Sequence, residues 1–152
     1  MSDPIQFTST TPNFALPLLF AGQAQKEFFV NEAHGLLDAL LHPAVEGESS
    51  TPPIAPVEGE TWLVAASAQG EWLGRGGYLA AYVGARWLLA PPQSGMLLFR
   101  KDLGQHAVYT GSWGSAAEPS IPSGGTTIDA EARTAISDLV AALRTAGILP
   151  QT

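Results

Sequence analysis

The sequence predicts an α+β fold: an extended N-terminal arm and helix, a small antiparallel β meander or barrel, and a C-terminal helix tethered by a linker. Three observations predict it. Near both ends of the chain, apolar residues recur at three- and four-residue steps, which is the period of an α-helix. Between them, short runs of strand-forming residues are separated by glycine, proline and polar residues, a pattern typical of antiparallel sheets. The chain has 152 residues, which is enough to bury a core of its own.

Residues 1–21 form the predicted arm. Its prolines, at positions 4, 12 and 17, remove backbone donors and favour extended geometry in the residues before them. The segment has little apolar surface around which to fold, so we expect it to dock on this domain or on a neighbouring chain. The contacts would come from its apolar residues, which are Phe14, Leu16, Leu18, Leu19 and Phe20.

Residues 22–45 form the predicted N-terminal helix. Pro43 ends the periodic run. Gly35 inside the helix either costs about 1 kcal/mol relative to alanine or marks a place of close packing. A polar, proline-rich connector follows at 46–58. The apolar residues that share one face of the helix are Phe29, Ala33, Leu36, Leu37, Leu40 and Leu41.

Residues 59–114 form the predicted antiparallel β domain. Two similar segments, at 82–87 and 109–113, each place an aromatic residue, a turn glycine and a tryptophan in that order, which is typical of hairpins. All four tryptophans and all three tyrosines of the chain lie in this region. Five short strands are expected here, at 61–66, 78–83, 86–89, 96–100 and 107–110.

A linker at 115–126 leads to the predicted C-terminal helix at 127–147. Thr127 or Asp129 can cap its start, and Gly147 suits the residue that follows a helix. A single helix of this length is marginal in water, so its apolar stripe needs a partner in this chain or in another. The stripe residues expected at an assembly interface are Ile136, Leu139 and Leu143.

The composition favours a protein that assembles with other chains. Charged residues make up 14% of the sequence, against roughly 25% in ordinary soluble domains, and hydrophobic residues make up 45%. We therefore expect part of the surface to be covered in a homo-oligomer, a ring or a trimer. The net charge of −7 argues against nucleic acid as a partner, because phosphate binding needs clustered lysine and arginine.

The sequence also indicates the cellular compartment in which the protein folds. It has no cysteine, so a disulfide framework and a thiolate metal or redox site are excluded. The start has no basic segment followed by an apolar core, as a signal peptide would, and no run of about 20 apolar residues could cross a membrane. We expect the protein to fold in the cytoplasm and to have no membrane partner.

No catalytic, cofactor or metal site is predicted. The three histidines lack metal-ligand spacing, and the glycine-rich segment at 74–77 does not match a phosphate-binding loop. There is no Gly-x-Ser-x-Gly turn of the hydrolase type. The carboxylate pairs at 46/48 and 58/60 lie in an acidic stretch, where solvation is a simpler explanation than catalysis.

The aromatic residues leave two alternatives open. Tryptophan and tyrosine rings stack on sugar rings, and they also fill cores and anchor interfaces. Trp72, Trp87 and Trp113 are the candidate carbohydrate contacts under the first alternative. Under the second, the same rings fill the interior of the small β domain.

Three stretches carry a resemblance to a known family. They are the segment at 16–40 with the string GQAQKE at 22–27, the string PVEGETWLV at 56–64, and IDAEARTAI at 128–136. Together they resemble an uncharacterised domain family of phage-derived proteins in alphaproteobacteria, which includes tail-fibre and spike components and parts of gene-transfer-agent particles. The resemblance covers most of residues 12–146.

The resemblance implies a non-enzymatic virion part, assembled in the bacterial cytoplasm and located in a phage-like particle. The expected role is a head spike base or a fibre adaptor that links capsid to a receptor-binding fibre. Capsid or spike-fibre proteins would be its partners, and bacterial capsular polysaccharide an indirect one. No catalytic residues belong to the family, so none are carried over. The alternative function is a carbohydrate-binding module that recognises host capsular polysaccharide through the aromatics of the β domain.

Overall fold

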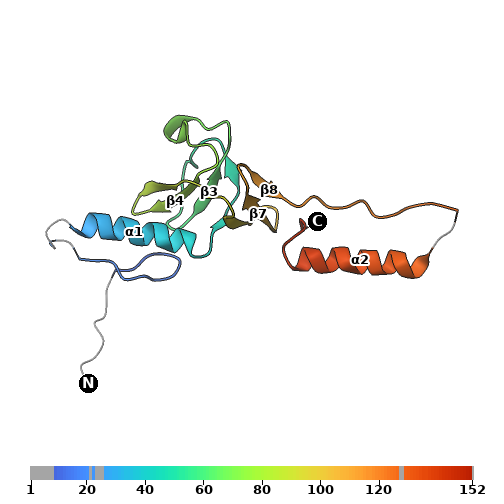
Figure 1. The fold of residues 1–152 in the computed structure, drawn as a ribbon. Coiled ribbons are helices and arrows are strands. Elements are labelled where there is room, and N and C mark those ends of the chain that lie inside the picture. The colour runs from blue at the N-terminus through green and yellow to red at the C-terminus, as the bar shows by residue number, and fades with distance from the viewer. Residues whose placement is uncertain (1–8, 21, 23–25, 127–128, 152) are drawn as a thin grey trace, which may run out of the picture. The chain divides into compact units, whose positions relative to one another are not determined.

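The computed structural model describes residues 9–20, 22, 26–126 and 129–151. The chain divides into two compact units, Met1–Pro92 and Gln93–Thr152. The described residues form two helices and eight strands, and the strands belong to two small sheets (Figure 1). The predicted α+β class is confirmed. The sheets are open and do not close into a barrel, because each contains only four short strands.

The sheet of the first unit contains β2 (Glu48–Ser49), β3 (Thr61–Val64), β4 (Leu79–Val83) and β5 (Arg86–Ala90), in that order. A further short strand, β1 (Ala44–Val45), precedes it in the chain. The β2–β3 pair is parallel, and the other two pairs are antiparallel. Gly84 and Ala85 join β4 to β5, and both have positive φ angles. Such a two-residue turn matches the twist of a tight hairpin.

Helix α1 (Lys26–Leu40) packs on this sheet through a glycine. A Cβ atom at Gly35 would lie 3.0 Å from Leu88 Cδ1 and 3.2 Å from Val83 Cγ1, so the residue marks close packing between helix and sheet. The regular helix ends at Leu40, and the residues after Pro43 belong to β1. Proline has no backbone N–H to continue the helical ladder, which explains why the helix stops before residue 45.

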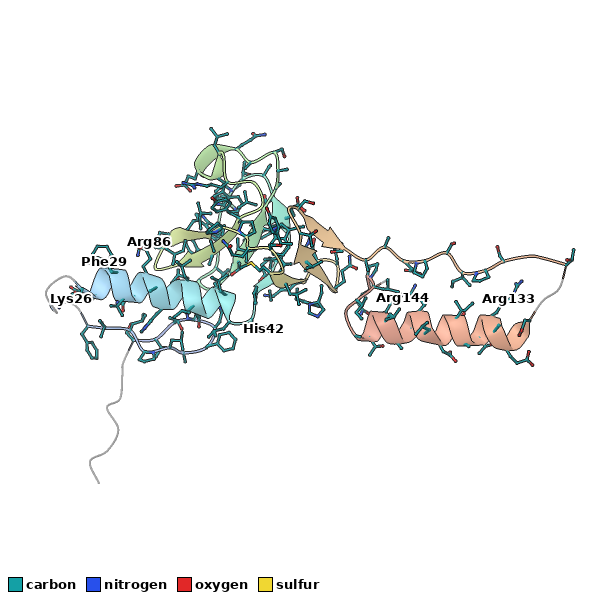
Figure 2. All side chains as sticks on the ribbon, in the orientation of Figure 1. Lys26, Phe29, His42, Arg86, Arg133 and Arg144 are labelled. Atoms are coloured by element: carbon teal, nitrogen blue, oxygen red, sulfur yellow. The ribbon has the colours of Figure 1, made fainter. Side chains whose placement is uncertain are left out.

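Much of the predicted apolar stripe of α1 lies on the surface, although Leu36 and Leu40 are half-buried. Phe29 is 81% exposed, Leu37 51% and Leu41 60%, whereas the buried residues of the helix are Glu27, Gly35, Asp38 and Ala39. Figure 2 labels Phe29 near the N-terminal end of the helix. The small residues at 35 and 39 allow the helix to approach the sheet closely. The most apolar face of α1 therefore remains on the surface.

Residues 9–20 form a tight loop along α1 rather than the expected extended arm. Thr10 and Pro17 form an isolated antiparallel bridge, and Leu18 N donates to Ser9 O. Asn31 of the helix exchanges two hydrogen bonds with the backbone of Leu19, at 2.9 and 3.1 Å. The loop folds back because polar side chains of α1 supply partners for its backbone. The rest of the predicted arm, 1–8 and 21, lies outside the described residues.

The second unit begins with three antiparallel strands, β6 (Leu97–Arg100), β7 (Gln105–Tyr109) and β8 (Trp113–Ser115). Residues 116–126 contain no helix or strand, and α2 (Ala130–Thr145) follows. Asp129 caps α2 by accepting a hydrogen bond from Ala132 N at 2.9 Å, while Thr127, the other predicted cap, lies outside the described residues.

The C-terminal end of α2 is fixed to the strands of its own unit. Gly147 has a φ of 69° and accepts a hydrogen bond from His106 N at 2.6 Å. Arg144, labelled in Figure 2, pairs with Glu118 of the preceding segment, and Arg133 donates to Gly124 O. These contacts hold the segment before α2 along the helix.

The β6–β7 turn contains a bidentate ion pair whose contribution to stability depends on pH. Arg100 donates to both carboxylate oxygens of Asp102, at 2.9 and 2.7 Å, and this hydrogen bonding lowers the pKa of Asp102 below its usual value. A carboxylate with a lowered pKa stabilises the fold above its unfolded-state pKa of about 4, and the contribution is lost as pH falls through the folded pKa.

We expect Asp102→Asn to destabilise the turn at pH 7. The variant should also show a smaller loss of stability than the parent when the pH falls below about 4. The effect should stay under about 1 kcal/mol, because the pair is partly solvated. Amide hydrogen exchange of the turn at pH 7 and at pH 3 measures it, with Asp138→Asn on α2 as the control. Equal acid sensitivity of the turn in parent and variant would contradict the expectation.

Candidate functional site

The face of the first sheet opposite α1 is aromatic. Side chains alternate along a strand, so Val83 and Leu88 reach the helix side, and Tyr82 and Trp87 lie on the other. A short 3-10 helix, η1 (Gly70–Trp72), places Trp72 on this second side. Trp72 is fully buried there in a cluster with Val64, Ala68 and Ala80, against which Trp62, Tyr78, Trp87 and Leu89 pack.

Ring contacts hold Trp87 in place. Its ring centroid lies 5.2 Å from that of Trp72 in an edge-to-face arrangement at 83°, and 5.0 Å from that of Tyr82 at 54°. Tyr82 and Trp87 are directly opposite each other in the β4–β5 register. Aromatic pairs of this kind contribute about 0.5–1.5 kcal/mol beyond the area that they bury. The sheet therefore presents a rigid aromatic surface.

An open cavity of about 480 Å³ lies against these rings. This volume is in the range of small-molecule binding sites. Two charged residues, Arg86 and Glu71, are among those that line it. Arg86 also forms an ion pair with Glu32 of α1 at 3.2 Å. The remaining lining comes from the proline-rich connector and the strands: Pro52, Pro53, Pro56, Trp72, Tyr82, Ala85, Trp87 and Leu89.

The fully buried Trp72 has an unsatisfied donor, because its Nε1–H has no acceptor among the described residues. A buried donor without a partner costs roughly 1–3 kcal/mol.

The three tryptophans predicted to contact carbohydrate have different surroundings. Trp87 lines the cavity and is half-buried, whereas Trp72 beside it is fully buried. Trp113 belongs to the other unit, where its ring lies 5.3 Å from that of Tyr109. The structure thus brings Trp72 and Trp87 together. Sequence reasoning missed Tyr82, Arg86 and Glu71, although the similarity of segments 82–87 and 109–113 pointed to the Tyr82–Trp87 pair.

The predicted assembly residues lie mostly at or near the surface. In the N-terminal loop, Phe14 and Phe20 are exposed, and Leu16, Leu18 and Leu19 are half-buried. On α2, Ile136 is 40% exposed and Leu139 60%, while Leu143 is half-buried. Among the described residues of α2, Val140 is the buried one. The apolar stripe of α2, like that of α1, is therefore largely uncovered in the single chain.

The described residues contain no group of three or more histidine, aspartate or glutamate side chains that could hold a metal ion. No helix within the described ranges is long and apolar enough to span a membrane.

Comparison with known proteins gives a family without an assigned role. No curated protein shows significant similarity to this chain. Residues 30–114 match a family described as "Protein of unknown function (DUF2793)". The match runs from α1 through β8 and therefore includes the strands that carry the aromatic cavity. The string at 22–27 lies outside the matched range. Because the match covers more than half of its length, the chain belongs to the DUF2793 family.

Proposed function

We propose that this chain is a non-enzymatic structural component of a phage-like particle of the gene-transfer-agent type. Its role there is a head spike base or fibre adaptor that links capsid to a receptor-binding fibre. The chain assembles in the bacterial cytoplasm with further copies of itself, as a ring or trimer, and with capsid or spike-fibre proteins. The observation that carries this proposal is the exposure of apolar stripes on both helices. The resemblance of 16–40 and 56–64 to spike and tail-fibre domains supports the particle assignment.

The exposed stripe of α1 has the geometry of a helix-packing ridge. Phe29, Ala33, Leu37 and Leu41 are spaced four residues apart, so they form one row along the helix. All four are exposed. Rows at this spacing interdigitate with those of a second helix, and a contiguous apolar surface on a soluble protein usually marks an interaction site.

The stripe of α2 offers a second surface. Ile136 and Leu139 project from a helix whose C-terminal end is joined to the strands of its own unit at Gly147 and whose Arg133 contacts the preceding segment at Gly124. A held helix loses little conformational freedom when a partner covers it, which favours association. The two stripes give the chain separate surfaces for a sister copy and for a particle protein.

We expect Leu139→Asp to reduce self-association and incorporation into particles by at least tenfold, because a carboxylate would be buried in an apolar contact. Light scattering of the purified chain gives the mass of the assembly, and quantitative immunoblotting of purified particles gives incorporation. Ser137→Asp adds the same charge to an exposed position of the same helix and should behave like the parent. Leu37→Asp tests the stripe of α1 in the same way. A parent chain that is monomeric and missing from particles would refute the proposal.

A second candidate function, recognition of host capsular polysaccharide, is favoured by one specific observation. Trp87 and Tyr82 line an open cavity beside charged side chains. Exposed parts of aromatic rings next to hydrogen-bonding groups are suited to the two faces of a sugar. This function is compatible with a particle component, because a spike that carries such a cavity would contact the cell surface directly.

A further inference from the structure

We propose that the cavity beside Trp87 binds an uncharged pyranose ring of a saccharide. The inference rests on the second candidate function and adds to it the site, the ring type and the charge. The ring lies against Trp87 and Tyr82, between the β4–β5 hairpin and the proline-rich connector, and Glu71 accepts hydrogen bonds from its hydroxyl groups.

The aromatic wall is already rigid before any ligand binds. Trp87 is held between the rings of Trp72 and Tyr82, at centroid distances of 5.2 and 5.0 Å. The facing wall contains Pro52, Pro53 and Pro56, whose φ angles are locked and which have no backbone donor. Binding a rigid, partly apolar ring between such walls orders few side chains, so little entropy opposes it. The C–H face of a pyranose provides the apolar contact that the rings require.

The polar groups of the lining match hydroxyl groups. A guanidinium can only donate hydrogen bonds, and an ionised carboxylate can only accept them. A sugar hydroxyl does both, so a hydroxyl of the ring can donate to the exposed Glu71 carboxylate. The Arg86 side chain lies on the α1 face of the hairpin, where it pairs with Glu32 at 3.2 Å.

The charge of the first unit disfavours an acidic sugar. Residues 1–92 contain nine acidic and three basic residues, which gives a formal net charge of −6. Arg86 is already paired with Glu32 of α1, and Glu71 adds a negative charge at the cavity. A uronic acid would therefore be repelled by the unit as a whole and would lack a free cation.

The test is a titration of the full-length ¹⁵N-labelled chain with the methyl glycosides of glucose, galactose, mannose and N-acetylglucosamine. The chain has four tryptophans, so four indole N–H signals report on the position of the ligand. We expect at least one glycoside to shift the Trp87 signal and to leave the Trp113 signal unchanged. Trp87→Phe should raise the Kd about tenfold and Trp113→Phe should not change it. Glu71→Gln should raise the Kd about threefold or more, and the exposed control Glu131→Gln should not.

Three results would overturn the inference, and they separate it from the function on which it rests. A Trp87 shift with methyl glucuronide but with no neutral glycoside would refute the uncharged ring and leave saccharide recognition standing. No Trp87 shift with either class would refute both. Equal losses in Trp87→Phe and Trp113→Phe would refute the site. Glu71 is exposed, so the Glu71→Gln variant decides the result even where Trp87→Phe fails to fold.

Discussion

Replacing Asp38 with alanine is expected to lower the free energy of unfolding of the first unit by about 3–5 kcal/mol. The Asp38 carboxylate is buried and accepts hydrogen bonds from Thr11 Oγ1, Asn13 N and Phe14 N, at 2.7, 2.8 and 2.7 Å. Thr11 Oγ1 in turn accepts a hydrogen bond from Leu16 N at 2.9 Å. The variant would leave these donors without their acceptor and would release the loop at 9–20 from α1.

Urea unfolding measures the loss, and amide hydrogen exchange at Asn13 and Phe14 locates it. Asp138→Ala is the matched control, because Asp138 is exposed on α2, and it should change stability by less than about 0.5 kcal/mol. Asp38→Asn keeps the shape and one acceptor oxygen, so it should cost less than the alanine variant. Unchanged protection of the two amides in Asp38→Ala would show that the carboxylate does not hold the loop.

The features that could be predicted from the sequence are those set by neighbouring residues. The cap at Asp129 and the positive φ at Gly147 depend on a few adjacent positions, and the structure has both. Each of the five expected strands also has a counterpart, since alternating residues between turn signals are local patterns. The β1 and β2 strands were not predicted, and β8 was expected only as the return strand of the hairpin at 109–113. They are only two or three residues long and too short to show a period.

The orientation of α1 could not be predicted, because it depends on contacts distant in sequence. Periodicity identified the apolar face of the helix, but the face that packs is the one with Gly35 and Ala39. Asp38 is accommodated in the interior because the loop at 11–14, 24 to 27 residues away, donates hydrogen bonds to its carboxylate. A single helical pattern does not contain that information.

The cavity escaped prediction for a related reason. Its lining combines the connector, which has the composition of a loop, with a hairpin more than 25 residues later in the chain. Trp72 and Trp87 were singled out for their ring chemistry, which the sequence does reveal. Whether a tryptophan is covered or accessible depends on the fold, and here one of the two is covered by the other.

Trp72→Ala is expected to cost about 3–5 kcal/mol of stability in the first unit. Trp72 is completely buried in the cluster with Val64, Ala68 and Ala80, and its truncation would leave a void that these small neighbours cannot fill. Trp87 would lose the ring that fixes it from one side. Urea unfolding followed by tryptophan fluorescence gives the free energy, and near-ultraviolet circular dichroism reports the loss of the ring contact.

The adjacent residue provides the control for this prediction. Leu73 is 73% exposed, so Leu73→Ala should change the free energy of unfolding by less than about 0.5 kcal/mol. Trp72→Phe should cost less than half as much as Trp72→Ala, because it keeps an aromatic ring in the cluster and removes the buried N–H that has no acceptor among the described residues. Similar losses for Trp72→Ala and Leu73→Ala would mean that the side chain at 72 is not the centre of this core. The rigid aromatic wall proposed for the saccharide cavity would then lose its support, because the ring of Trp72 packs against that of Trp87.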